Sequence, residues 1–239
     1  MQNLYFQLDC WDGPDGEPII YHGWTLTSKL LFADVLSDAI APYAFTASPF
    51  PLILSIENHC SSDQQDRMAQ HFREILGEHL FTQPVDSSLS KLPSPEFFKN
   101  KILIKAKKLK LVKKSITADE SFDNETLNIE KQMLDFTTEI IGSQDRKMSK
   151  EENNIPATKT SSKALSDLVN YTEAVKFTGF QEEGSEIQRN FWEMSSFEES
   201  KASSFTSNDS TARQFLDYNV NHLSRIYPKG TRLFSSNLG

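Results

Sequence analysis

The chain has little cysteine and no long apolar run, and each absence argues against a class of protein. Only Cys10 and Cys60 occur in 239 residues, and neither stands in a Cys-x-x-Cys or Cys/His spacing. Structural zinc and a secreted disulfide framework are therefore not expected. We expect a reducing, cytoplasmic location instead. No apolar run reaches the ~18 residues of a membrane span. The start, MQNLYFQ, lacks the charged and apolar regions of a signal peptide.

Charge and composition narrow the possibilities further. The formal net charge of −8 argues against a nucleic-acid-binding protein. Hydrophobic residues make up 38% of the chain, a low share that predicts some residues outside any core. A local basic run still lies between Lys101 and Lys114. Residues 1–7 resemble a common tag-cleavage site, so we set them apart as a possible non-native start.

Strand and helix patterns alternate over residues 8–114. The turn residues of WDGPDGEP separate two extended runs, and LILSI has the composition of a strand buried on both faces. Apolar residues recur at helical spacing from Leu30 to Ile40 and again from Met68 to Leu76, and KILIKAKKL predicts a third strand. The alternation predicts an α/β fold with right-handed crossovers between parallel strands.

The composition changes in residues 115–163, where acidic residues outnumber basic ones by ten to six. This stretch predicts a disordered acidic linker. Within it, residues 127–141 have apolar residues near helical spacing, which fits either a docking helix or a helix that forms only weakly. In residues 164–239 we expect order to return, with a strand at NFWEMSSF, helical patterns up to Ile226, and a turn and strand at YPKGTRLFSSN.

Three groups of reactive side chains follow predicted strands: Asp9 with His22, Glu57, and Lys105 with Lys107. In parallel α/β folds, ligands bind outside the carboxyl ends of the strands. Carboxylates suit Ca²⁺ or Mg²⁺, lysines suit phosphate, and a histidine can protonate a leaving oxygen. Taken singly, these residues also fit a surface cap, a structural histidine and a solvated charge run. Only their convergence favours a phosphate-handling site.

Long motifs in the chain resemble eukaryotic phosphoinositide-specific phospholipase C. LDCWDGPDGEPIIYHG, PLILSIENHCS and LPSPEFFKNKILIKAKKL are similar to its X half, and FWEMSSFEESKA and YNVNHLSRIYPKGTRLFSSN are similar to its Y half. The resemblance covers most of residues 8–114 and 164–238, and the acidic stretch falls where the family has its variable linker. It implies a (β/α)₈ TIM barrel split into X and Y halves, here incomplete, and leaves the subclass open.

The resemblance also implies an activity and a set of site residues. The activity is calcium-dependent hydrolysis of phosphatidylinositol 4,5-bisphosphate to diacylglycerol and inositol trisphosphate. Asp9 and Glu57 match the family's Ca²⁺ ligands, and His22 and Glu57 match catalytic residues. Contacts to the ring phosphates or the inositol ring are implied for a further set of residues: Lys105, Lys107, Ser196, Arg225 and Tyr227.

The chain departs from the family's pattern at several positions. The family's His-Asn pair, expected upstream of Leu8, is not found, and Gln7 stands where the family has an acid. Phe234 replaces the acid of the family's DSSN motif, and the last barrel strands are not found after it. We therefore expect an incomplete barrel that is poorly stable and weakly active by itself, because an unclosed parallel sheet exposes its edges.

Three hypotheses for function remain at this point. The first is an enzyme that acts at the membrane surface, with transient peripheral association and an unknown upstream activator. The second is a phospholipase-like protein that binds phosphoinositides or inositol phosphates without cleaving them. Gln7 favours the second hypothesis, whereas Asp9, His22 and Glu57 favour the first. The third is a non-functional truncation.

Overall fold

A computed structural model of the chain describes residues 5–22, 28–109, 161–180 and 189–229. Most of the expected linker, the segment 127–141 and Phe234 lie outside the described residues. By its internal contacts the chain divides into one unit of residues 1–109 and 158–239 and a second unit of residues 110–157. The description below concerns the first unit.

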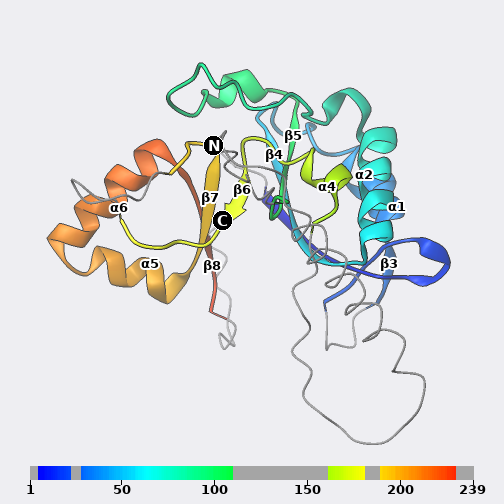
Figure 1. Cartoon of the computed structure of the whole chain (residues 1–239), viewed down its shortest axis with the longest axis horizontal. Helices are drawn as coiled ribbons and strands as arrows, with labels where there is room; N and C mark the ends of the chain where they lie inside the picture. Colours follow the sequence, from blue (N-terminus) through cyan, green and yellow to red (C-terminus); the bar gives the residue numbers. More distant parts are fainter. Residues whose placement is uncertain (1–4, 23–27, 110–160, 181–188, 230–239) are drawn as a thin grey trace, which may run out of the picture. The chain divides into compact units, whose positions relative to one another are not determined.

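The described elements follow one another in the order shown in Figure 1. The strands and helices have these bounds: β1 (Tyr5–Trp11), η1 (Pro14–Gly16), β2 (Ile19–Ile20), β3 (Leu30–Leu31), α1 (Phe32–Asp34), η2 (Val35–Ile40), β4 (Leu52–His59), α2 (Ser62–Leu76), η3 (Gly77–His79), η4 (Pro95–Phe98), β5 (Ile102–Lys105), α4 (Lys163–Ser166), β6 (Glu173–Val175), β7 (Glu193–Glu198), α5 (Glu199–Thr206), α6 (Asp209–Asn221) and β8 (Leu223–Tyr227).

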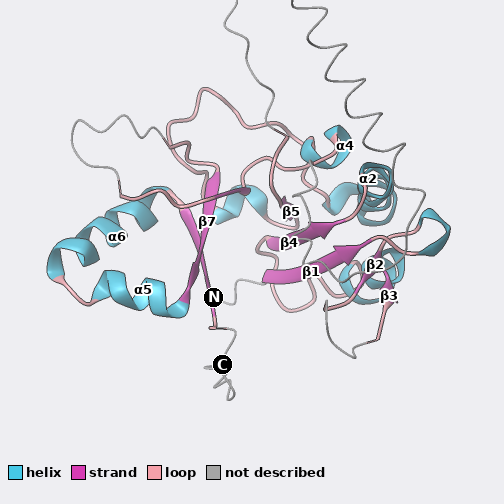
Figure 2. Cartoon of the chain, turned by 60° about the horizontal axis from the view of Figure 1, so that its bottom comes forward, coloured by secondary structure: helices cyan, strands magenta, loops and turns pink. Residues whose placement is uncertain are grey.

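Parallel strands form the centre of both sheets. The first sheet has the order β3-β2-β1-β4-β5, and the second has the order β6-β7-β8. Strand β4 pairs in parallel with β1 and with β5, while β2 and β3 continue the sheet as antiparallel hairpins (Figure 2). Strand β7 likewise pairs in parallel with β6 and β8. The α/β prediction is therefore confirmed.

The largest core lies between one face of the first sheet and helices α1, η2, α2 and α4. Alternate residues of β1 and β4 point into it, with Leu8, Cys10, Leu54 and Ile56 all buried. Helix α2 contributes an apolar face spaced by three and four residues, and its members are Met68, Ala69, Phe72 and Leu76. The buried residues recur every second position in the strands and every three or four positions in the helix. These are the periods of a strand and of a helix, which is why these segments form those elements.

A second apolar cluster joins residues from both halves of the sequence. Phe81, Phe98 and Leu103 pack with Tyr171 and Phe191. Nearby, the Thr172 hydroxyl donates to the Ile104 carbonyl at 2.9 Å, and the Ala174 amide donates to the Ala106 carbonyl at 2.9 Å. These bonds tie the segment that enters β6 to the end of β5.

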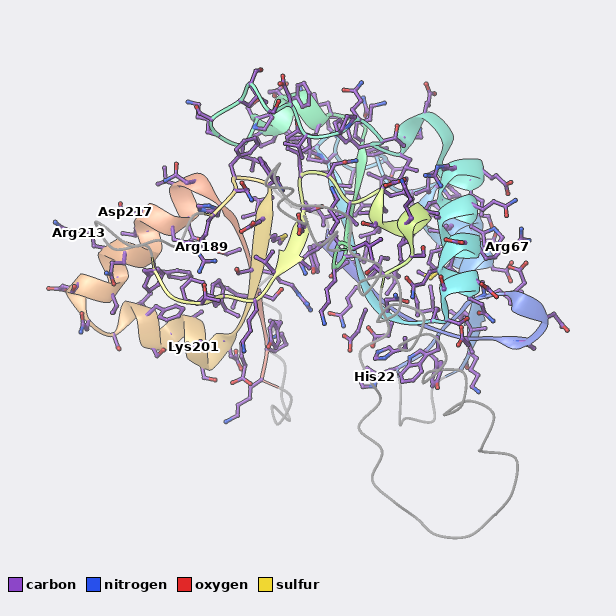
Figure 3. The ribbon with its side chains drawn as sticks, in the orientation of Figure 1. His22, Arg67, Arg189, Lys201, Arg213 and Asp217 are labelled. Atoms are coloured by element: carbon purple, nitrogen blue, oxygen red, sulfur yellow. The ribbon has the colours of Figure 1, made fainter. Side chains whose placement is uncertain are left out.

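A third cluster is almost entirely aromatic and lies against α5 and α6. Its buried members are Phe197, Ala202, Phe205, Phe215 and Tyr218. The guanidinium of Arg189 lies 5.0 Å from the ring centre of Phe177 and 5.6 Å from that of Tyr218 (Figure 3). The cation stabilises the cluster because it faces the electron-rich rings.

Two secondary-structure predictions are wrong. Leu30 and Leu31, expected at the start of a helix, form β3 and are exposed, and the helix begins only at Phe32. The buried positions of the helical segment that begins at Phe32 are Phe32, Leu36 and Ile40, four residues apart. Leu30 and Leu31 precede this segment and only lengthen the apolar pattern in the sequence. The second error is β8, which lies within a stretch read as helical. Pairing of β8 with β7 overrides that weak helical pattern.

The turn after β1 is fastened to α2 by polar contacts. The Gln64 amide exchanges hydrogen bonds with the backbone of Gly13, at 3.0 Å from its N–H and 2.8 Å to its carbonyl. Glu17 accepts from Arg67 at 2.6 Å and pairs with Nε2 of the buried His71 at 2.7 Å. Hydrogen bonds from Arg67 and His71 lower the pKa of the Glu17 carboxyl. The strand end that carries Asp9 is thereby held against the helix.

Gly13 is expected to tolerate no side chain. A Cβ there would lie 2.2 Å from the Glu17 carbonyl oxygen and 2.6 Å from Cγ2 of Ile19. We expect Gly13→Ala to lower the free energy of unfolding by about 2–3 kcal/mol through overpacking. Gly16→Ala is the matched control, since Gly16 has φ +75° and open space around it. It should cost only about 1 kcal/mol through backbone strain. Equal losses for the two variants in urea unfolding would contradict this account.

Candidate functional site

The face of the first sheet opposite the main core carries polar side chains in register. The parallel pairing places Gln7 opposite Ser55, and Asp9 opposite Glu57. On the other side of β4, Ser55 is opposite Lys105. The side chains of one strand alternate between the two faces of the sheet. These residues therefore lie on the face opposite to that of the buried Leu8 and Ile56. This register brings the predicted residues Asp9, Glu57 and Lys105 to the same face of the sheet.

Asp9 and Glu57 are joined by the side-chain amide of Gln7. Its Nε2 donates to Oδ1 of Asp9 at 2.8 Å and to Oε2 of Glu57 at 2.7 Å. Two carboxylates at opposed positions of adjacent strands repel each other. The two N–H groups of one amide relieve that repulsion because each faces one acid.

An imidazole on the same strand supports Glu57. Nε2 of His59 lies 3.5 Å from Oε1 of Glu57, and the ring of His59 stacks on Trp11 with a centroid separation of 3.9 Å. Trp11 also lies 5.3 Å from the ring of Tyr21. The acid is thus held from one side by Gln7 and from the other by a histidine that an indole keeps in place.

Arg225 on β8 reaches the same group of residues. Its guanidinium donates to Oε1 of Gln7. It also lies over two aromatic rings, 5.2 Å from the centre of Tyr5 and 5.1 Å from that of Tyr227. Ser196 is the register partner of Arg225 on β7. Three of the predicted substrate-binding residues, Ser196, Arg225 and Tyr227, therefore lie together.

Lys105 is a buried ammonium close to another cation. Its residue is only 6% exposed. Burial, and then the charge of Arg225, lower the pKa of Lys105 from 10.5 to about 8. Among the residues that the structure describes, no acceptor or carboxylate pairs with this ammonium. A buried charge without a counter-ion is costly, so this position favours an anionic ligand.

The two remaining predicted residues, Lys107 and His22, lie at the margin of the site. Lys107 is exposed and lies two residues beyond the end of β5. His22 is exposed and follows Tyr21, whose amide donates to the carbonyl of Asp9 at 3.2 Å. That bond brings the backbone of His22 to the end of β1, and Figure 3 labels its side chain.

Several neighbours of the site were not among the predicted residues. They are Tyr5, Ser55, His59 and Trp11, while Gln7 was noted only as a departure from the family's pattern. Tyr5 and Gln7 fell in the segment set apart as a possible non-native start, although they continue β1 and pair with Ile53 and Ser55. The alternation Tyr5, Gln7, Asp9 was the available signal, because residues two apart on a strand share a face.

The donor set suits a divalent cation only in part. No cluster of three or more His, Cys, Asp or Glu side chains able to hold a metal occurs among the described residues. Asp9 and Glu57 nevertheless form a pair of adjacent carboxylates that already shares one positively polarised group, the NH₂ of the Gln7 amide. Hard cations take such oxygen ligands, so the pair fits a cation that completes its shell with other oxygens.

The chain matches known proteins over nearly all of its length. Residues 4–108 match the family model of the phosphatidylinositol-specific phospholipase C X domain, and residues 165–239 match that of the Y domain. The chain is 46% identical over 235 residues to 1-phosphatidylinositol 4,5-bisphosphate phosphodiesterase delta-1 of Rattus norvegicus, covering 97% of this chain and 29% of the relative. It therefore spans less than a third of the length of that relative.

Two further comparisons bear on activity and fold. Inactive phospholipase C-like protein 2 of Homo sapiens is 39% identical over 233 residues, covering 97% of this chain and 19% of that protein. The crystal structure of PLC21 from S. officinalis matches with a TM-score of 0.69 and 39% identity, covering 98% of this chain and 27% of that one. The barrel-type α/β fold expected from the sequence is confirmed by this likeness.

Replacing Lys105 should stabilise the fold at neutral pH. The unfolded chain holds the Lys105 proton more tightly than the folded chain, so the penalty is full below pH 8 and vanishes above about pH 10.5. We expect Lys105→Met to raise the free energy of unfolding by about 1–3 kcal/mol at pH 7, with the gain shrinking from pH 8 upward.

Denaturant unfolding at several pH values measures this difference. Lys107→Met is the matched control, because that lysine is exposed and its loss should change stability by less than about 0.5 kcal/mol. A Lys105→Met effect that stayed constant from pH 7 to pH 10.5 would rule out the buried ammonium as its source.

Proposed function

Because the chain belongs to the phosphatidylinositol-specific phospholipase C family, we propose that it forms the substrate site of a phosphoinositide phospholipase C. The proposed reaction is hydrolysis of phosphatidylinositol 4,5-bisphosphate to diacylglycerol and inositol 1,4,5-trisphosphate. One observation supports this most directly: the buried ammonium of Lys105 and the half-buried guanidinium of Arg225 are close enough to interact, and Gln7 connects Arg225 to the Asp9–Glu57 pair. A bound polyphosphate would balance the two cations.

The cationic side of the site would recognise the ring phosphates. Lys105 and Arg225 supply charge, Lys107 adds a further ammonium, and Ser196 adds a hydroxyl beside Arg225. Tyr227, 36% exposed, offers an aromatic face to the inositol ring. Lipids without the ring phosphates would leave the buried Lys105 ammonium unpaired, which is a strong basis for selectivity.

The acidic side of the site would hold a calcium ion through Asp9 and Glu57. Bound there, the cation would supply charge to polarise the scissile phosphate and acidify the inositol 2-hydroxyl. Glu57, held by Gln7 and His59, would keep a fixed carboxylate beside that hydroxyl. Glu57 would accept the proton of that hydroxyl as its oxygen attacks phosphorus, forming a cyclic phosphodiester while the bond to the diacylglycerol oxygen breaks.

His22 would act as a general acid in the first step and as a general base in the second. In the first step it would donate a proton to the departing diacylglycerol oxygen. In the second it would accept one from the water that opens the cyclic phosphodiester, while Glu57 returns its proton to the departing 2-oxygen. Its position supports this role, because the Tyr21–Asp9 backbone bond holds it at the end of β1.

A second function, phosphoinositide binding without cleavage, has one specific observation in its favour. The Gln7 amide already satisfies Asp9 and Glu57, the two groups that would hold the cation. In either function the protein would meet lipid from the cytoplasmic side by transient peripheral association. No helix in the described part of the chain is long and apolar enough to cross a membrane.

Release of water-soluble inositol phosphate from phosphatidylinositol 4,5-bisphosphate vesicles separates the two functions. The enzyme hypothesis predicts release with calcium, none with chelator, and at least a 100-fold loss in His22→Ala, since general acid–base catalysis contributes about 10²–10⁴-fold. Vesicle binding that depends on Lys105 and Arg225, with no release, would instead support the binding function. Release that His22→Ala leaves unchanged would refute the proposed role of that histidine.

A further inference from the structure

Every hydrogen-bonding group of the Gln7 side chain is used, and its partners carry opposite charges. Its nitrogen donates to Asp9 and Glu57, and its oxygen accepts from Arg225. One neutral amide thus connects the proposed phosphate-binding cation to the proposed cation-binding acids. The residue itself lies on β1, two positions before Asp9 and opposite Ser55.

These partners fix the orientation of the amide. Turning it over would place the nitrogen against the Arg225 guanidinium, two donors facing each other. It would also place the oxygen against two carboxylates, three acceptors facing one another. Each mismatched group would lose a charge-assisted hydrogen bond, the stronger class of such bonds. Arg225 therefore holds the amide with its nitrogen toward the acids.

This orientation is unfavourable for a metal ion. A cation that bridges Oδ1 of Asp9 and Oε2 of Glu57 must displace two N–H groups, and the nitrogen of an amide is not a ligand for hard cations. The amide oxygen is a suitable ligand, but Arg225 engages it. The acids become accessible to a cation once Arg225 releases that oxygen.

We propose that Gln7 is a positioning residue that makes cation binding at Asp9 and Glu57 depend on an anion at Arg225. Phosphate groups on a ligand take the donors of Arg225, the amide turns, and its oxygen joins the two carboxylates as a third ligand. The proposal rests on the proposed function, because it assumes that Arg225 binds a phosphate. By linkage, the cation strengthens anion binding by the same factor.

Calcium titration calorimetry with and without inositol 1,4,5-trisphosphate tests the dependence. For the wild-type chain we expect the trisphosphate to tighten calcium binding by about tenfold or more, within the usual range of coupling between sites. Gln7→Leu keeps the direct attraction between calcium and phosphate but removes the amide, so its coupling should be several-fold smaller. Equal coupling in the wild type and Gln7→Leu would overturn the proposal.

Gln7→Glu tests the blocking step without the trisphosphate. A carboxylate cannot donate to Asp9 and Glu57 and is itself a calcium ligand, so calcium should bind this variant about tenfold more tightly than the wild type. Gln70→Glu is the matched control, because it makes the same charge change on the exposed side of α2 and should leave calcium affinity unchanged. Circular dichroism melts verify that each variant is folded.

The outcomes separate this proposal from the proposed function. If the trisphosphate binds neither the wild type nor any variant, the proposed function fails and the anion dependence fails with it. If it binds the wild type but does not change calcium affinity, only the role of Gln7 is overturned. Equal calcium affinity in the wild type and Gln7→Glu would show that the amide does not block the acids.

Discussion

The parallel pairing of β1 with β4 is the constraint on which both the core and the site depend. It runs in register from Tyr5 opposite Ile53 to Trp11 opposite His59. Side chains alternate between faces, so a slip of one residue would send Leu8 to the polar face and Asp9 into the core. The apolar residues that bury one face thereby determine which acids meet on the other. Stability and chemistry are specified by a single register.

The site itself opposes folding, and the surrounding structure compensates. Lys105 and Arg225 place like charges together, with the ammonium buried. The compensation comes from the packed core around Phe32 and Phe72 and from the contacts that fasten the turn to α2, such as Glu17 with Arg67. Strain of this kind at a functional site is a general feature, since charges placed for a ligand lack partners until it binds.

Much of this fold follows from sequence periodicity, and the exceptions have physical causes. LILSI and the apolar face of α2 were predictable because burial on one or both faces leaves a regular pattern. β8 was not, because its pairing with β7 lies far outside any local window. Asp9, Glu57 and Lys105 were predictable as strand-end residues. Their connection through Gln7 was not predictable, because the amide bonds to partners that are 2 and 50 residues away in the sequence.

The identity of residue 7 determines how the four charges of the site balance. With a neutral amide, the acids Asp9 and Glu57 and the cations Lys105 and Arg225 sum to zero, and hydrogen bonds through Gln7 join the two signs. An acid at this position would leave an excess negative charge that only a cation could relieve. A chain with glutamine therefore has no net charge among these four groups when empty, although Lys105 lacks a direct partner among the described residues, and binding either ligand alone changes that sum. An anion and a cation bound together offset part of each other's charge, which makes the two binding events interdependent.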